Sequence, residues 1–142
     1  VEEQGLILDA HANFLLIISY NPGYQNLLKD LKTSTRQRFI AIDFDYPEES
    51  TEASIIAHES GVDAHSAGAL ASLGARIRNL RQHGFDEGVS TRLLIYAGQL
   101  INQGVAADRA CDVAISRAVS DDIEVQTAMN EVVSSIFPES GS

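Results

Sequence analysis

The stretch that decides the fold of this chain is Ala64-His-Ser-Ala-Gly-Ala-Leu-Ala-Ser-Leu-Gly-Ala-Arg-Ile-Arg-Asn-Leu80. Its large aliphatic side chains recur at spacings of three and four and therefore share one helix face: Leu70, Leu73, Ile77 and Leu80. Such a stripe is typical of the core of a helix bundle rather than of a cofactor site. We predict a helix over about residues 64–82, opened by Asp63 or Ala64.

Further helices are predicted on both sides of this stretch, over about 50–60, 90–102, 107–117 and 121–136. The third of the five carries a second stripe of the same kind, formed by Leu93, Leu94, Ala97, Leu100 and Ile101. Ser90 is a good N-cap for it, and Gly104 a suitable end. Asp121 or Asp122 caps the last helix, and Pro138 follows it. The second part of the chain is therefore expected to be a small helical bundle.

The first part has a different pattern. Phe14-Leu-Leu-Ile-Ile-Ser-Tyr20 is a continuous apolar run, as expected of a strand buried in a parallel sheet. Asn21-Pro22-Gly23 ends it, Tyr24 to Leu31 predicts a short helix, and Phe39 to Tyr46 predicts a second strand. Strand, helix and strand make a βαβ unit, and further strands must come from elsewhere because two are too few. The predicted fold class is therefore α/β plus all-α, with a boundary at Pro47.

Composition excludes several classes of protein. The formal net charge of −10 argues against nucleic-acid binding, which depends on Lys and Arg. No apolar run is long enough to span a membrane. The single Cys111 cannot form an internal disulfide, which favours a reducing, cytoplasmic location, and its apolar neighbours indicate a small core residue rather than a nucleophile.

Common catalytic and metal motifs are missing from these residues. There is no G-x-x-x-x-G-K-[ST] phosphate loop and no G-x-S-x-G elbow. His58-Glu59 lacks the second histidine of a zinc-binding helix, so we predict no metal site. The chain opens at Val1 and its only methionine is Met129, so we expect a processed chain or a piece of a longer protein.

Three clusters remain, and their order and spacing are specific: Ser19-Tyr-Asn-Pro-Gly23, Thr33-Ser-Thr-Arg-Gln-Arg-Phe39 and Gly88-Val-Ser-Thr-Arg-Leu-Leu94. Together they resemble the MoxR branch of AAA+ ATPases, and within it the CbbQ/NorQ (NirQ) group. The likeness extends roughly from Gly5 to Phe137. It implies that residues 1–47 are the C-terminal part of the AAA+ nucleotide-binding core, and that 48–142 form the helical lid domain.

The resemblance also implies roles for four residues. Asn21 matches sensor 1, beside the γ-phosphate, although by itself it could be a turn residue before proline. Arg38 matches the arginine finger that reaches a neighbouring subunit, with Arg36 a possible second; a surface salt bridge is the alternative. Arg92 matches sensor 2, which contacts phosphate from the same subunit. Its alternative is simple exposure near a helix start, where a cation is slightly unfavourable.

For the whole protein, the resemblance implies a ring-forming ATPase that uses ATP and Mg²⁺. This chain alone is expected to bind neither tightly, because the phosphate loop and the Mg²⁺-binding strand lie outside it. The implied partners are further copies in a hexamer, a protein with a von Willebrand factor A domain, and a client such as Rubisco or nitric oxide reductase. The alternative is a non-catalytic acidic protein-interaction module derived from an AAA+ lid.

Overall fold

The computed structural model describes residues 9–19, 33–80 and 88–138. The chain divides into two compact units, Val1–Asp43 and Phe44–Ser142, and each is considered by itself. The first unit contains the short helix α1, Thr33–Arg36. The second contains α2 (Glu49–Ser60), α3 (Ala64–Leu80), α4 (Thr91–Asn102), α5 (Ala107–Cys111), the π-helical segment η4 (Asp112–Ser116), α6 (Arg117–Val119) and α7 (Ile123–Ile136).

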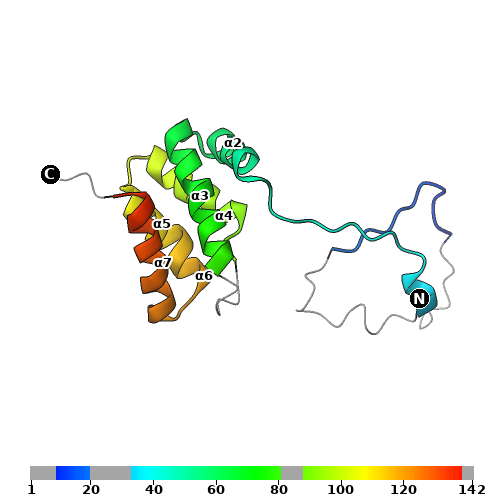
Figure 1. Ribbon diagram of the computed structural model, residues 1–142. Coiled ribbons are helices and arrows are strands. Elements are labelled where there is room, and N and C mark those ends of the chain that lie inside the picture. The colour runs from blue at the N-terminus through cyan, green and yellow to red at the C-terminus, as the bar shows by residue number, and fades with distance from the viewer. Residues whose placement is uncertain (1–8, 20–32, 81–87, 139–142) are drawn as a thin grey trace. The chain divides into compact units, whose positions relative to one another are not determined.

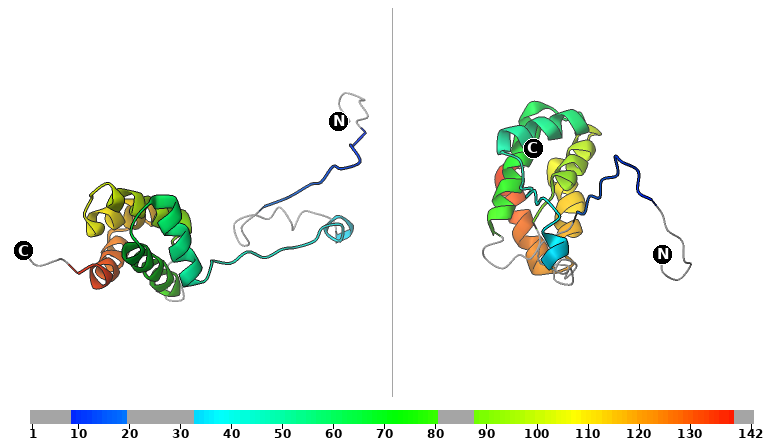
Figure 2. Two further views of the ribbon diagram at one scale, coloured as in Figure 1. Left: turned by 90° about the horizontal axis from the view of Figure 1, so that it is seen from above. Right: turned by 90° about the vertical axis from the view of Figure 1, so that its right-hand side faces the viewer.

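The second unit is a helix bundle (Figures 1 and 2). α2 packs against α3, and α4 packs against both, while α7 closes the other side of the bundle against α3, α5 and η4. One continuous apolar core lies between them. Its largest fully buried aliphatic and sulfur-containing side chains are Ile56, Leu70, Leu73, Ile77, Leu94, Ile115 and Met129.

The five predicted helices of the bundle are confirmed, with ends within a few residues of those expected. Both stripes face the core: Leu70, Leu73 and Ile77 are fully buried in α3, as are Leu94 and Ala97 in α4. The periodicity sufficed here because a helix with an apolar face at spacings of three and four turns that face toward the core.

The predicted helix boundaries at Asp63, Asp122 and Gly104 are confirmed, whereas Ser90 occupies the N-cap position of α4 without making a side-chain capping bond. Asp63 opens α3 by accepting hydrogen bonds from the N–H groups of His65 and Ser66, at 2.9 and 3.0 Å. Asp122 opens α7 by accepting from the Glu124 N–H at 2.8 Å. Gly104 adopts φ of 90° and gives its N–H to Ile101, while the Val105 N–H returns to Leu100, which together end α4.

The run from α5 to α6 contains a feature that the sequence did not predict. Residues Asp112–Ser116 widen into a π-helix between two α-helical ends. Such segments are rare and occur mostly as single turns inside α-helices. Ile115 and Ser116 are fully buried there, so the wider turn still contributes to the core.

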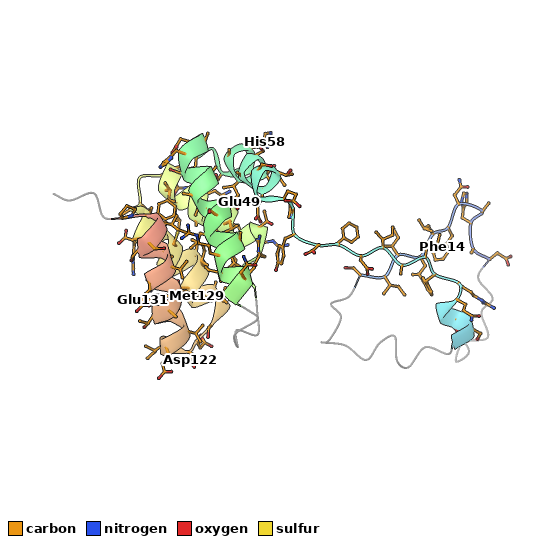
Figure 3. All side chains as sticks on the ribbon, viewed as in Figure 1. Phe14, Glu49, His58, Asp122, Met129 and Glu131 are labelled. Atoms are coloured by element: carbon orange, nitrogen blue, oxygen red, sulfur yellow. The ribbon has the colours of Figure 1, made fainter. Side chains whose placement is uncertain are left out.

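The predicted parallel sheet is wrong: the described residues contain no strand. Residues 14–18 and 40–44 run as irregular chain, with Phe14 67% exposed, Ile40 93% and Phe44 92% (Phe14 is labelled in Figure 3). A strand is held by hydrogen bonds to its neighbours, and two short apolar segments are too few for a stable sheet. Tyr20 and the predicted helix from Tyr24 to Leu31 lie outside the described residues.

Among the helices that the structure describes, none combines the length and apolar character needed to cross a bilayer.

Candidate functional site

The first turn of α4 carries the one sequence-predicted site residue of the bundle, Arg92. Ser90 precedes the helix in an extended conformation, and its carbonyl oxygen accepts from the N–H groups of Leu93 and Leu94, at 3.0 and 3.4 Å. Arg92 is exposed, and the first turn holds no acidic residue. Helix starts carry partial positive charge, so a guanidinium at this position favours an anion nearby.

A buried ion pair lies behind this helix start. Both oxygens of the Glu52 carboxylate in α2 accept from Arg78 in α3, each at 2.7 Å from a terminal guanidinium nitrogen. The side chain of Glu52 is 1% exposed and that of Arg78 is 11% exposed. The geometry is the planar, two-bonded match that arginine makes best with a carboxylate.

The same two side chains hold the residues that lead into α4. The Nε–H of Arg78 donates to the Val89 carbonyl oxygen at 2.8 Å. The Thr91 hydroxyl donates to Oε1 of Glu52 at 2.6 Å. Through these two bonds the ion pair fixes the backbone before α4 and the first side chain of α4, immediately next to Arg92.

Tyr46 completes this cluster from the stretch that precedes α2. Its ring lies 3.7 Å from the guanidinium carbon of Arg78, measured to the ring centroid. Stacking of this kind is favourable for arginine. We refer to Tyr46, Glu52, Arg78, Val89 and Thr91 as the α4 clamp. It joins the stretch before α2, helices α2 and α3, and the beginning of α4.

Close packing supports the clamp. A Cβ atom placed on Gly74 would lie 2.7 Å from Cδ1 of the fully buried Leu94 and 3.4 Å from Nη2 of Arg78. The absence of a side chain at Gly74 therefore allows α3 to approach α4 beside the ion pair. Among the described residues, no buried side-chain nitrogen or oxygen is left without a hydrogen-bond partner. The clamp is therefore fully satisfied, which a buried charged group requires.

The other predicted site residues lie elsewhere. Arg38 is exposed in the first unit, and its backbone N–H donates to the Thr35 carbonyl oxygen at 3.1 Å. Arg36 is the last residue of α1, and its side chain lies outside the described residues. Asn21 also lies outside them. The structure thus places Arg36 and Arg38 in one short segment and Arg92 in a separate unit.

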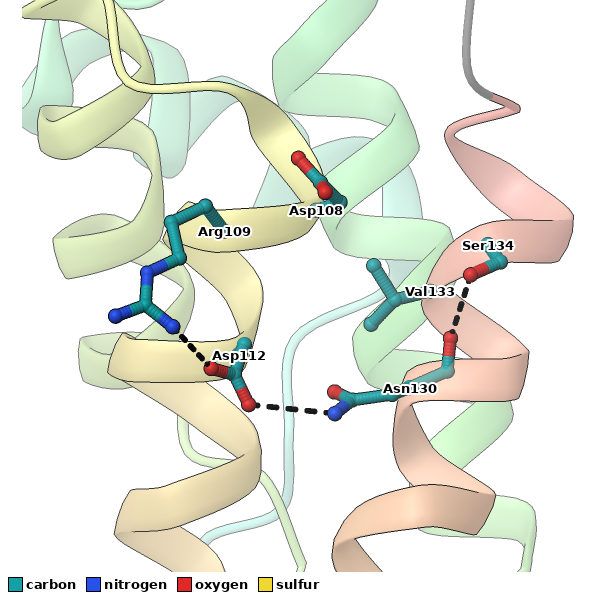
Figure 4. A pocket seen from close by; sticks show the side chains of 6 residues that line it. All are labelled: Asp108, Arg109, Asp112, Asn130, Val133 and Ser134. Carbon is teal, nitrogen blue, oxygen red and sulfur yellow. Dashed lines mark hydrogen bonds and ion pairs between the residues drawn. The ribbon is translucent and has the colours of Figure 1, made fainter.

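A second polar cluster surrounds the π-helix, where a shallow depression is lined by Asp108, Arg109, Asp112, Asn130, Val133 and Ser134 (Figure 4). Asp112 accepts from Arg109 at 2.9 Å, from Arg117 at 3.1 Å and from the Asn130 amide at 3.2 Å. Burial raises the pKa of Asp112, but these hydrogen bonds and the two arginines outweigh it, so the pKa is lowered overall. The Asp112 carboxylate is thus bonded by neighbouring side chains, as in a structural network.

The buried thiol of Cys111 is also explained by its surroundings. Cys111 is fully buried, and that burial, with Asp108 nearby, raises its pKa to about 12. The prediction that it is a core residue is confirmed, since a buried neutral thiol is a poor nucleophile. Within the described ranges, no three His, Cys, Asp or Glu side chains gather in a way that could hold a metal ion.

The sequence interpretation missed Glu52 and Arg78. A signal existed: Glu52 lies four residues before the fully buried Ile56 and Arg78 lies four residues after the buried Gly74, so each shares a helix face with a buried residue. A carboxylate on an inward-facing position requires a buried cation or donor. The partner could not be chosen from sequence, because the two residues are joined only by the packing of α2 on α3.

The fold and the α4 clamp define the class of domain: an acidic α-helical bundle in which the first turn of α4 carries the exposed Arg92. Residues 52–136 match the sequence profile of the family described as CbbQ/NirQ/NorQ C-terminal. The chain is 49% identical over 137 residues to "Protein CbbQ" of Hydrogenophilus thermoluteolus, covering 96% of this chain and 51% of that protein. It is 44% identical over 137 residues to "Protein NorQ" of Paracoccus denitrificans, with the same two coverages.

A third relative is "Denitrification regulatory protein NirQ" of Pseudomonas aeruginosa, 48% identical over 133 residues, which cover 94% of this chain and 51% of that protein. The chain therefore belongs to the CbbQ/NirQ/NorQ family, and the resemblance found from its motifs is confirmed. It spans about half the length of these relatives.

Proposed function

We propose that this chain is the C-terminal part of a ring-forming AAA+ ATPase subunit, which uses ATP hydrolysis to remodel and activate a client enzyme. Membership of the CbbQ/NirQ/NorQ family supports this proposal. So does the name of one relative, a denitrification regulatory protein. In this proposal the bundle Phe44–Ser142 is the lid that responds to nucleotide.

The observation that carries the proposal is the position of Arg92. Its guanidinium is exposed in the first turn of a 12-residue helix, where the helix dipole adds to its positive charge. These groups fit one contact with a phosphate oxygen, and no more than that. In this proposal the phosphate loop and the Mg²⁺ ligands belong to the rest of the protein; the G-x-x-x-x-G-K-[ST] motif does not occur in these 142 residues.

In the assembled ring, Arg38 reaches the nucleotide of a neighbouring subunit, with Arg36 as a second cation in the same segment. The exposure of Arg38 is compatible with contact in trans. A guanidinium supplied in this way stabilises charge on the transferring phosphoryl group. Asn21 orients the attacking water or a phosphate oxygen within its own subunit.

The remaining parts of the proposal concern assembly and clients. The protein forms a hexamer in the cytoplasm and works with a partner that bears a von Willebrand factor A domain. Its client is Rubisco or nitric oxide reductase. The similar identities to relatives named CbbQ and NorQ, 49% and 44%, favour neither client strongly.

The test has two steps. First, the coding sequence upstream of Val1 is read for G-x-x-x-x-G-K-[ST] in the same frame. Second, the full-length protein is purified and its ATP hydrolysis measured with and without Mg²⁺, alongside a variant in which the loop lysine is replaced by alanine. Turnover that is lost in the lysine variant supports the ATPase. A full-length protein without the loop and without turnover would support the acidic interaction module instead.

A further inference from the structure

Two hydrogen bonds link the start of α4 to the buried ion pair of Glu52 and Arg78. Arg78 donates to the Val89 carbonyl oxygen, and Thr91 donates to Glu52. Arg92 follows Thr91 directly, but its own side chain is exposed. Thr91, whose hydroxyl is bonded to the buried pair, and the exposed Arg92 are therefore neighbours in one helical turn, but their side chains face different surroundings.

We propose that Glu52 and Arg78 are positioning residues for Arg92: by holding the Val89 carbonyl and the Thr91 hydroxyl, they set where the Arg92 guanidinium meets a nucleotide phosphate. The inference rests on the proposed function, because it concerns the same contact. It adds two residues that do not touch the nucleotide.

The Glu52–Arg78 pair is better explained by its directional hydrogen bonds to Val89 and Thr91 than by a contribution to the stability of the bundle. A buried ion pair loses much of its attraction to desolvation, and well-packed apolar replacements are often as stable. What such replacements cannot supply is a donor for Val89 and an acceptor for Thr91. The planar guanidinium also fixes angles, since its Nε–H and its two terminal nitrogens point in set directions.

Tyr46 extends the effect to the residues before α2. Because its ring stacks on Arg78, a shift of the stretch Phe44–Glu48 against the bundle changes the surroundings of the guanidinium that holds Val89. The clamp therefore makes the placement of Arg92 depend on how the chain enters α2.

The experiment uses the full-length protein and a variant designed to fold: Glu52→Leu combined with Arg78→Met. Removing one partner alone would leave a buried unpaired charge and strongly destabilise the fold, whereas the double replacement removes both charges. Thr91→Val is a milder second variant that deletes only the bond to Glu52. Arg109→Met is the matched control, because Arg109 is an ion-paired arginine of the same bundle, 62% exposed, outside the clamp.

Two readouts are expected to change together. The dissociation constant for ATP should rise on the order of tenfold in the double variant and less in Thr91→Val, because this is the scale of losing one hydrogen bond to a charged group. Amide hydrogen exchange in residues 89–94 of the nucleotide-free protein should become faster. Adding Arg92→Ala to the double variant should weaken ATP binding little further, because the clamp acts through Arg92.

The outcomes separate the two proposals. If the wild-type protein binds no ATP, the proposed function fails and this inference fails with it. Suppose instead that the wild type binds ATP, and the folded double variant binds it as tightly as Arg109→Met does. In that case only the positioning role is overturned. Full additivity with Arg92→Ala would also overturn it, since independent sites add.

Discussion

Gly98 of α4 lies against Ser60 of α2 so closely that a Cβ atom on Gly98 would be 2.6 Å from the Ser60 hydroxyl oxygen and 2.9 Å from its Cβ. The hydroxyl is held in place, because it donates to the Ile56 carbonyl oxygen at 2.6 Å. Ser60 is buried, so its side chain has little room to move. The two helices therefore cross where one of them has no side chain.

Gly98→Ala should destabilise the bundle by about 1–3 kcal/mol, the usual cost of overpacking a filled core. Helix propensity alone predicts the opposite sign, a gain of about 1 kcal/mol for replacing glycine inside a helix. The free energy of unfolding in urea, measured for wild type and variant, decides between the two effects.

Gly68→Ala is the matched control. Gly68 lies inside α3, and nothing lies within 4 Å of the position that its Cβ would take. This substitution should therefore stabilise the protein by up to about 1 kcal/mol. If Gly98→Ala were stabilising to the same degree as Gly68→Ala, the close approach of α2 and α4 would be contradicted.

The bundle could be predicted from the sequence because its helices are specified locally. The stripe through Leu70, Leu73 and Ile77 sets the buried face of α3, and Asp63 marks its beginning. The sheet was a poorer prediction because an apolar run such as Phe14 to Ile18 indicates that the segment is buried, but it does not specify the segment against which it packs. Strand formation depends on hydrogen-bond partners that lie elsewhere in sequence.

The candidate site was predictable only in part. Arg92 came from a motif, and the structure confirms that it lies in the first turn of a helix. The α4 clamp did not come from any motif. Glu52 and Arg78 are 26 residues apart, and Glu52 and Thr91 are 39 apart, so only the packing of α2, α3 and α4 brings them together.

A pH dependence is expected from Asp63, whose pKa is lowered by the hydrogen bonds from the Ser66 side chain and backbone. A carboxyl group with a lower pKa in the folded state contributes stability above its unfolded pKa of about 3.9. That contribution is lost as the pH falls through the folded pKa. Asn keeps the capping geometry but not the charge. The stability difference between wild type and Asp63→Asn should therefore be constant near neutral pH and shrink below about pH 4.

The buried Cys111 gives a second chemical prediction. Its pKa of about 12 means that almost no thiolate is present at pH 8. Iodoacetamide should therefore leave the native protein unlabelled over a time in which the urea-unfolded protein is labelled completely, as followed by mass spectrometry. Equal labelling rates in the two states would show that the core around Cys111 opens readily.

Arg38→Ala, made in the full-length protein, should lower the rate of ATP hydrolysis while leaving ATP binding largely intact. A finger acts on charge that develops in the transition state, and it contributes on the order of 10³–10⁵-fold in GTPases; we expect a loss of at least about tenfold. Arg109→Ala is the control, since it removes an exposed arginine of the bundle. Normal turnover in assembled Arg38→Ala rings would exclude the role.

Arg92 should respond differently from Arg38, because it contacts the nucleotide of its own subunit. Arg92→Ala should weaken ATP binding, and Arg92→Lys should weaken it less, because Lys keeps the charge but lacks the planar fork. The measurement is a nucleotide titration of the full-length wild type and both variants. Arg76→Ala, which removes another exposed arginine, on α3, serves as the control.

Stability provides the discriminating comparison for Arg92. A cation in the first turn opposes the helix dipole, so its removal should leave the free energy of unfolding unchanged or raise it by less than about 0.5 kcal/mol. Nucleotide affinity is therefore expected to fall in Arg92→Ala without any loss of stability. A residue that only decorates the bundle surface would change neither, and one that mainly supports the fold would lower both. Equal ATP affinities in wild type, Arg92→Lys and Arg92→Ala would exclude Arg92 as a sensor, even if all three proteins were equally stable.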